Sequence, residues 1–463
     1  MKYSYSPAQS IEKLDPKVAQ LCVTEEKESY VLRQEYGRNV VRLGVEDRKS
    51  VTRRQLILLA RRGIALAKSQ KIKRLAVSLA DFTFPHLRMS EMEIGELFAV
   101  NFEMANYEFV KYKTLPKGGW SMVEEIVVYG KVGKEGKKGI EKGRIVGEEV
   151  NVARTLSNTP GGEMTPRVLA KAAQDAAKNT NVLVRILGLK EIQKLSMGGV
   201  LGVAKGSLEE PRFIILEYWG GRKKERPIVL VGKGVTFDTG GLNIKPGDAM
   251  NEMHMDMSGG AAVLLAVVLS AKLGLKKNVV ALVPAVENMP SGSSYRPGDI
   301  LRTMSGKTIE VLNTDAEGRI ILADALTYAK KYRPRLVVDV ATLAGATMSA
   351  LGQRASAIYT RDEKLEKLFR ELGEESGDYV WPLPLWDEYE EDIKGTFGDV
   401  INLGKTKYGG AITGAIFLYQ FAKDYPWVHI DICPRMTSIE GEFLAKGATG
   451  VPVRLLAKML ERL

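Results

Sequence analysis

The second half of the chain alternates short runs of β-branched and apolar residues with longer segments of helical periodicity. Runs of four to eight such residues are typical of strands that are buried on both faces of a sheet. The expected strands are RPIVLVG (226–232), NVVALVPA (278–285), TIEVLN (308–313) and RLVVDVAT (335–342), and the expected helices are SGGAAVLLAVVLSAKLG (258–274) and RIILADALTYAKKY (319–332). This alternation predicts an α/β domain with a mixed, largely parallel central sheet flanked by helices.

The first part of the chain predicts a smaller, N-terminal α/β domain. A chain of 463 residues is long for a single core, so two domains are expected. The expected helices are residues 53–69 and 93–113, and the expected strands are residues 75–82 and 121–130. We interpret the Gly- and Lys-rich stretch KVGKEGKKGIEKGR (131–144) as a solvated connector in preference to a phosphate-contacting patch. The predicted boundaries are 1–140 for the N-terminal domain, 141–158 for a linker helix and 159–463 for the C-terminal domain.

Composition narrows the class of protein. The net charge of +11 is compatible with nucleic acid or acidic partners, but the positive charges are spread along the chain. Two cysteines, Cys22 and Cys433, exclude a disulfide framework, and the N-terminal segment lacks the apolar core of a signal peptide. No run of about 18 apolar residues is present, so no membrane span is expected. These features predict a cytoplasmic protein.

Acidic residues gather where the expected strands end. KGVTFDTGGLNIKPGD (233–248) follows one strand, NEMHMDMSGGAAV (251–263) leads into the buried helix, and NTDAEGRI (313–320) lies between a strand and a helix. Together these segments supply the acids Asp238, Asp256, Asp315 and Glu317 and the bases Lys233, Lys245 and Arg319. The carboxyl ends of strands are where open α/β sheets form their sites, so we expect these side chains to meet.

Four carboxylates at one sheet edge repel one another unless positive charge compensates them. A divalent metal is the economical compensation, and an oxygen-rich ligand set suits Mn, Mg or Zn. The chain has only three histidines, so a metal would depend on carboxylates. Two metal ions can share one carboxylate, polarise a carbonyl and activate a water.

Each of these residues also has a simple structural explanation. Asp256, directly before a helix, is a typical N-cap, and Glu317 and Arg319 can fill a turn. A phosphate-binding P-loop is excluded, because SGKT (305–308) has Leu301 where the motif requires its first glycine. The joint occurrence of acids and bases at the same kind of strand end favours an assembled site.

A long, ordered set of motifs extends the pattern to the C-terminus. The set comprises VGKGVTFDTGGLNIKP (231–246), DMSGGAAV (256–263), ENMPSGSSYRPGD (287–299), NTDAEGRI (313–320), LADALTYA (322–329), ATLAGA (341–346), YGGAITGAIFL (408–418), WVHIDI (427–432) and GATGVPV (447–453). With these motifs the chain closely resembles the leucyl aminopeptidase family of two-metal exopeptidases, and NTDAEGRI is similar to that family's signature octapeptide. The resemblance is strong over roughly 155–463 and loose over the first 140 residues.

The resemblance implies a role for each charged residue. One tightly held metal would be bound by Lys233, Asp238, Asp256 and Glu317, and a more exchangeable one by Asp238, Glu317 and the carboxylate and backbone carbonyl of Asp315. A lysine ligand must be neutral, and an adjacent dication would lower its pKa from the usual ~10.4. Lys245 would stabilise the oxyanion of the tetrahedral intermediate, and Arg319 would hold a bicarbonate ion that acts as the general base.

The implied activity is the metal-dependent release of N-terminal amino acids from peptides by attack of a metal-bridging hydroxide, with no acyl-enzyme. The free α-amino group of the substrate would bind the tight metal and Asp256. Substrate-binding residues carried over by position are Met253, Asn313, Thr342, Gly345 and Met436. This apolar pocket predicts a preference for Leu, Met and other neutral or apolar residues. The implied cofactors are two Mn or Zn ions, with Mg or Co as alternatives, and the implied assembly is a homohexamer.

The chain departs from the family pattern at three places. Cys433 and Pro434 stand where small residues are usual, Ala344 stands where Thr is frequent, and TPGGEMTP (159–166) has Gly-Gly where Pro-Asn is common. The first two departures lie near the expected specificity pocket and bear on substrate preference. An additional or principal role as a DNA-binding regulatory protein is kept as the alternative, because the chain is basic. A non-catalytic relative is disfavoured, because all seven charged positions are intact.

Overall fold

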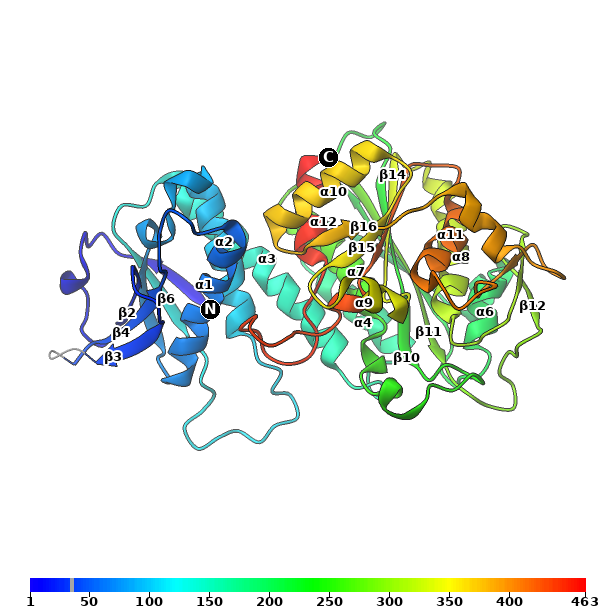
Figure 1. Cartoon of the computed structure of the whole chain (residues 1–463), viewed down its shortest axis with the longest axis horizontal. Helices are drawn as coiled ribbons and strands as arrows, with labels where there is room; N and C mark the ends of the chain where they lie inside the picture. Colours follow the sequence, from blue (N-terminus) through cyan, green and yellow to red (C-terminus); the bar gives the residue numbers. More distant parts are fainter. Residues whose placement is uncertain (34–36) are drawn as a thin grey trace. The chain divides into compact units, whose positions relative to one another are not determined.

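The computed structural model describes residues 1–33 and 37–463, which form two compact units (Figure 1). The first unit comprises Met1–Asn151 and Ser438–Lys446, and the second comprises Val152–Thr437 and Gly447–Leu463. The first unit contains a six-stranded sheet in the order β1-β6-β5-β2-β4-β3, in which β3 is antiparallel to β4 and the other pairs are parallel. Its elements are β1 (Lys2–Tyr5), β2 (Ala19–Thr24), β3 (Tyr30–Arg33), β4 (Asn39–Gly44), α1 (Arg53–Ser69), β5 (Arg74–Ser78), α2 (Glu91–Asn106), β6 (Glu125–Tyr129) and the beginning of α3 (Lys134–Asn158).

Helix α3 corrects the expectation for residues 131–144. Most of this stretch is not a connector but the first turns of a 25-residue helix. Its glycines recur on one helix face, at 136, 139, 143 and 147, and this face packs on α2. A Cβ atom at Gly139 would lie 2.1 Å from the carbonyl oxygen of Met92, and one at Gly143 would lie 2.5 Å from that of Glu96. The glycines therefore allow two helix backbones to approach closely.

The second unit contains a nine-stranded, largely parallel sheet with helices on both faces, as the sequence predicts. The strand order is β16-β15-β18-β14-β9-β11-β8-β7, and β10 pairs with β11 off this path. The pairs β11/β8, β8/β7 and β15/β18 are antiparallel, which makes the sheet mixed. Its strands are β7 (Leu183–Leu187), β8 (Arg212–Trp219), β9 (Ile228–Gly232), β10 (Gly234–Asp238), β11 (Asn278–Asn288), β14 (Leu336–Ala341), β15 (Ser356–Tyr359), β16 (Val380–Pro382) and β18 (Trp427–Asp431).

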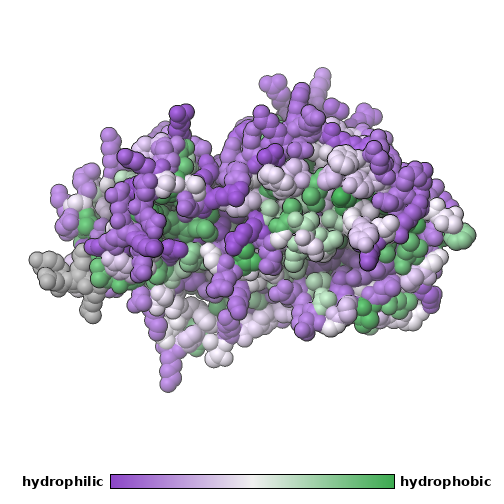
Figure 2. All heavy atoms as spheres, in the orientation of Figure 1, coloured by the Kyte–Doolittle hydropathy of each residue, from purple (hydrophilic) through white to green (hydrophobic). Residues whose placement is uncertain are grey.

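The helices of the second unit bury the two faces of this sheet in separate cores (Figure 1). One core contains residues of α6 (Gly198–Ala204), α8 (Glu317–Ala329) and α11 (Gly410–Ala422), and the other contains residues of α4 (Pro166–Ala177), α7 (Ser258–Lys272), α10 (Glu363–Ser376) and α12 (Val453–Arg462). Within β9, Val229 and Val231 face the first core, and Ile228 and Leu230 face the second. Hydrophilic side chains cover most of the visible face of each unit, with apolar residues in small patches between them (Figure 2). The remaining helices are α5 (Leu189–Lys194) and α9 (Gly345–Leu351).

The strand predicted over 308–313 differs from the expectation. Only β13 (Thr308–Glu310) forms, and it belongs to a small separate sheet with β12 (Ile300–Arg302) and β17 (Val400–Ile401). The backbone N–H groups of Leu312 and Asn313 donate to the side chain of Asn402, not to a neighbouring strand. The octapeptide 313–320 is thus held by side chains, at the start of α8.

One described segment, Gly247–Lys272, is long and apolar enough to cross a membrane by length and composition. Within the structure, 89% of its most apolar window is buried. Because the segment includes α7, packed against β9, β11 and β14, it is a core helix of the second unit.

Candidate metal centre and active site

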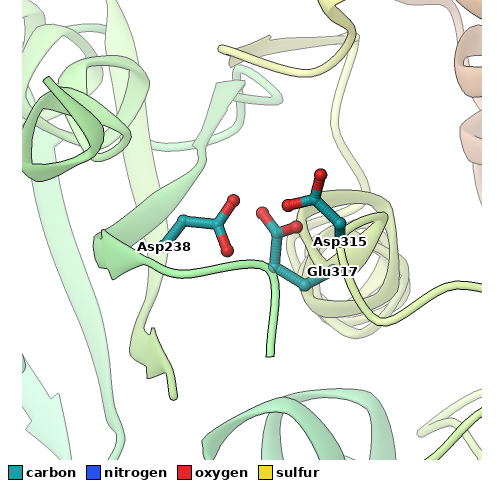
Figure 3. Close-up of side chains that lie close together, drawn as sticks. All are labelled: Asp238, Asp315 and Glu317. Atoms are coloured by element: carbon teal, nitrogen blue, oxygen red, sulfur yellow. The ribbon is translucent and has the colours of Figure 1, made fainter. Parts of the chain in front are cut away.

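Four carboxylates and two lysines of the second unit converge on one place. Lys233 lies between β9 and β10, Asp238 ends β10, and Asp256 lies just before α7. Asp315 lies just before α8, and Glu317 begins that helix. Figure 3 shows Asp238, Asp315 and Glu317 pointing toward one another, and each offers a carboxylate oxygen within 4.8 Å of the others. The structure thus brings together the acids that the sequence predicted.

Lys233 lies among the more buried acids. Its Nζ is 2.7 Å from Asp256 Oδ2 and 2.8 Å from Glu317 Oε1, and it donates to the carbonyl oxygen of Thr342 at 2.8 Å. Gly318 makes this arrangement possible, because a Cβ atom at that position would lie 2.6 Å from Cε of Lys233. The glycine of the octapeptide is therefore required by the close approach of the lysine side chain.

Lys245 contacts the other two acids. Its Nζ lies 2.9 Å from Asp238 Oδ2 and 2.5 Å from Asp315 Oδ1. The second oxygen of Asp238 accepts hydrogen bonds from the Gly240 N–H at 2.9 Å and from Asn288 Nδ2 at 2.8 Å. Neutral donors and one ammonium thus orient the Asp238 carboxylate.

Burial and neighbouring charges strongly shift the pKa values of the ionisable groups at this site. Burial, together with the neighbouring charge of Asp238, raises the pKa of Glu317 to about 8, against the lowering effect of Lys233. Burial raises the pKa of Asp256 to about 6, although Lys233 lowers it. Burial alone would lower the pKa of Lys233, but Asp256, Glu317 and Asp238 outweigh it, and the pKa is raised. Two ammonium groups therefore compensate part of the negative charge of the four carboxyl groups.

The chemistry of these donors fits divalent cations. Three buried oxygens, Asp256 Oδ2, Asp315 Oδ1 and Glu317 Oε1, face a lysine ammonium, yet none of them accepts a hydrogen bond of acceptable geometry from the described residues. Buried polar atoms are normally hydrogen-bonded, so exceptions call for an explanation. Carboxylate oxygens grouped in this way are the ligands that hard divalent cations take.

Asp256 does not serve as a helix cap. The residue at the N-cap of α7 is Met257, which makes no side-chain cap, and the Asp256 carboxylate accepts hydrogen bonds from Lys233 Nζ and from the Thr342 hydroxyl instead. The N-cap interpretation, the simpler alternative from the sequence, is therefore wrong.

Arg319 is a buried cation close to the carboxylates. Its side chain is 5% exposed, and Nη1 donates to the carbonyl oxygen of Asn402 at 2.9 Å. Its Nε has no hydrogen-bond partner among the described residues. Burial lowers the pKa of Arg319 to about 10, although the charges of Glu317 and Asp431 act in the opposite direction. A buried guanidinium with an N–H group that makes no hydrogen bond to the described residues is suited to binding an anion.

The five residues carried over as substrate-binding lie on four segments. Thr342 is the most closely tied to the carboxylates, since its hydroxyl donates to Asp256 Oδ1 at 2.5 Å. Met253 shares a 3-10 turn with Asp256, and Gly345 begins α9, where a Cβ atom would meet open space. The Asn313 side chain accepts from the N–H of Asp315 at 2.7 Å, which shapes the octapeptide. Met436 follows the turn Cys433–Arg435 and is half-buried.

Sequence reasoning missed the neutral and remote residues that hold the site. Asp431 is fully buried at the end of β18, and its carboxylate accepts hydrogen bonds from the N–H groups of Leu343, Ala344 and Cys433 and from the hydroxyl of Thr347. Asn402 similarly binds the backbone of the octapeptide. The position of Asp431 could have identified it from the sequence, because a polar residue at the end of a buried strand is also a candidate for the site.

Comparison with known families agrees with this geometry. Residues 151–457 match the sequence profile of the cytosol aminopeptidase family, catalytic domain. The chain belongs to the cytosol aminopeptidase family. This membership places it among metal-dependent aminopeptidases, hydrolases of the leucyl aminopeptidase type whose members use two metal ions.

Two relatives named probable cytosol aminopeptidase illustrate the similarity. The relative from Azoarcus sp. (strain BH72) is 48% identical over 335 residues, which span 72% of this chain and 66% of the relative. The relative from Burkholderia mallei (strain SAVP1) is 44% identical over 393 residues, which span 84% of this chain and 77% of the relative. Both matches support membership of the cytosol aminopeptidase family.

Solved structures of one other protein share the fold over nearly the whole chain. The bottromycin maturation enzyme BotP is 29% identical, with a TM-score of 0.86, and the match covers 96% of this chain and 98% of BotP. A structure of BotP in complex with Mn is 28% identical, with a TM-score of 0.85.

Proposed function

We propose that this member of the cytosol aminopeptidase family is a cytoplasmic exopeptidase that releases N-terminal Leu, Met and other neutral or apolar residues from peptides. The observation that carries this proposal is the convergence of four carboxylates with two lysines and a buried arginine. The names of the relatives support a cytosolic location.

Five side chains would hold the metal ions. Lys233, Asp238, Asp256 and Glu317 would bind one cation, and Asp238, Asp315 and Glu317 would bind the other. Two divalent cations supply a polarised carbonyl and an activated water when bound. Mn or Zn fits this donor set, with Mg or Co as alternatives, and the Mn complex of the similar BotP supports Mn.

Lys233 can act as a ligand only after losing its proton. The neighbouring acids raise the pKa of Lys233 in the structure, and cations bound to those same acids would reverse the effect. Lys233 and the cations thus compete as the positive partner of Asp256 and Glu317.

The remaining roles in the proposed reaction belong to charged residues at the site. Asp238, Glu317 and Asp315 together raise the pKa of Lys245 against the effect of burial. Lys245 is not among the proposed ligands, so its ammonium would remain available to stabilise the developing oxyanion. Arg319, whose Nε has no hydrogen-bond partner among the described residues, would hold a bicarbonate ion, which would supply the general base. Asp256 accepts the α-amino group of the substrate, which restricts cleavage to the N-terminus.

The substrate side chain occupies a pocket that includes Met253, Thr342, Gly345 and Met436, while Asn313 shapes the adjoining turn. One methylene changes the preference of an apolar pocket by only ~1–3 kcal/mol, so a broad preference for neutral side chains is expected. We also propose the homohexamer that the family resemblance implies.

The test is metal-dependent hydrolysis of leucine p-nitroanilide. Protein treated with a chelator should be inactive, and adding Mn, Zn, Mg or Co in turn should restore activity with at least one metal. N-acetyl-leucine p-nitroanilide, which lacks the free α-amino group, should remain uncleaved. The proposal is wrong if no metal restores activity or if the acetylated substrate is cleaved equally well.

A further inference from the structure

Thr314 is the polar residue of the octapeptide to which the chemistry above gives no task, yet every polar atom it has is hydrogen-bonded. It is fully buried, and its hydroxyl donates to the carbonyl oxygen of Gly240 at 2.6 Å and accepts from the N–H of Asn243 at 2.8 Å. Its own N–H donates to Asn243 Oδ1 at 2.8 Å. Its carbonyl oxygen accepts from Asn288 Nδ2 at 2.9 Å and from the Tyr295 hydroxyl at 2.6 Å.

These bonds join the octapeptide to the loop 239–245, which connects Asp238 to Lys245. The loop reverses direction at Gly240 and Gly241, whose φ angles are +86° and +65°. It passes so close to the octapeptide that a Cβ atom at Gly241 would lie 3.0 Å from the hydroxyl oxygen of Thr314. The N–H of Lys245 closes the loop on the carbonyl oxygen of Thr239 at 2.9 Å. Thr314 therefore holds in place the backbone of the loop that carries the Lys245 side chain.

The same cluster also orients a carboxylate. Asn288, fully buried at the end of β11, uses one amide group to bind both the Thr314 carbonyl and Asp238 Oδ1. The ammonium of Lys245 contacts the other oxygen of Asp238. A shift of Thr314 would thus move the lysine and one of its two acidic partners relative to the octapeptide.

We propose that Thr314 is a positioning residue, which fixes the loop 239–245 against the octapeptide and so sets the place of the Lys245 ammonium at the reacting carbonyl. This inference rests on the proposed function, which gives Lys245 its role. An oxyanion donor acts only where its position matches the developing charge, and a misplacement of about 1 Å can reduce the rate about 10²-fold.

Two substitutions separate the hydroxyl from the shape of the side chain. Thr314→Val keeps the shape and removes the hydroxyl, whereas Thr314→Ser keeps the hydroxyl. We expect Thr314→Val to reduce kcat about 10²-fold, with KM and bound metal close to those of the wild type, and Thr314→Ser to retain most of the activity. Asn243→Ala, at an exposed position, should lower kcat in the same direction even if Thr314→Val fails to fold.

The matched control is Thr303→Val. Thr303 is also buried, and its hydroxyl bonds Ser305 and the carbonyl oxygen of Lys307 in the turn between β12 and β13. This control should leave kcat unchanged. Equal loss of kcat in Thr303→Val and Thr314→Val, or wild-type kcat in both Thr314→Val and Asn243→Ala, would overturn the inference.

Hydrogen exchange gives a readout that does not depend on activity. The amides of Asn243 and Lys245 should exchange faster in Thr314→Val than in the wild type or Thr314→Ser, while exchange in β14 stays unchanged. Unchanged exchange over 239–245 would contradict the positioning role. If the wild type itself hydrolyses no aminoacyl substrate with any metal, the proposed function fails, and this comparison still decides whether Thr314 holds the loop.

Discussion

At the scale of single residues, the charged groups of the site are held in place by neutral side chains, among them Asn288, which donates to Asp238, and Asn402, which binds the backbone of Asn313. Asp238, Asp315 and Glu317 were found because acids next to a glycine-rich turn at a strand end are a strong signal. Asn288 and Asn402 bind the backbone and carboxylates of the same site, but a lone asparagine has no spacing that marks it as functional. Their roles depend on contacts between segments far apart in the chain, which only the structure shows.

The two lysines differ in what their removal should do. Lys245→Ala should reduce kcat by about 10²–10³-fold, the usual scale for losing an oxyanion donor, and should leave metal content near normal. Steady-state kinetics and metal analysis measure both effects, and Lys171→Ala, an exposed surface residue paired with Asp175, is the control. A loss of metal in Lys245→Ala would show that Lys245 is a ligand instead.

At the scale of elements, the period of the pattern predicted the helices α1, α2, α7 and α8 and the strands β5, β6, β9, β11 and β14, and composition misled in one place. Residues 131–144 are rich in glycine and lysine, as connectors often are, but the spacing of Gly136, Gly139 and Gly143 follows a helix face. Positional spacing was the stronger signal, because a glycine stripe permits close packing of two helices. The strand over 308–313 was overpredicted because Asn402 replaces a neighbouring strand as the acceptor.

The packing of α3 on α2 is testable with single methyl groups. Gly139→Ala should lower the free energy of unfolding by about 1–3 kcal/mol, because the new methyl would meet the carbonyl oxygen of Met92, a backbone atom of α2 and not the end of a flexible side chain. This loss opposes a helix-propensity gain of up to ~1 kcal/mol. Gly136→Ala meets only the flexible side chain of Glu91 and should cost clearly less. Urea denaturation measures both, and equal stability of Gly139→Ala and the wild type would contradict this packing.

At the scale of the whole molecule, the predicted fold class is confirmed, and the second unit contains every residue of the candidate site. The order of strands in the nine-stranded sheet was beyond prediction, because local periodicity does not specify which strands pair. The preference for apolar substrates, the hexamer and the binding of DNA by this basic chain stay predictions. The central claim is that four carboxylates and Lys233 form a site for two divalent cations.

The most direct measurement of that claim is the number of divalent cations bound per chain. Protein stripped with a chelator and dialysed against Mn or Zn should bind two ions per chain by elemental analysis, and Glu317→Gln, which alters a proposed shared ligand, should bind fewer. Lys171→Ala should bind two, as the wild type does. Wild-type protein that binds neither metal, or that binds as many ions as Glu317→Gln does, would contradict the account.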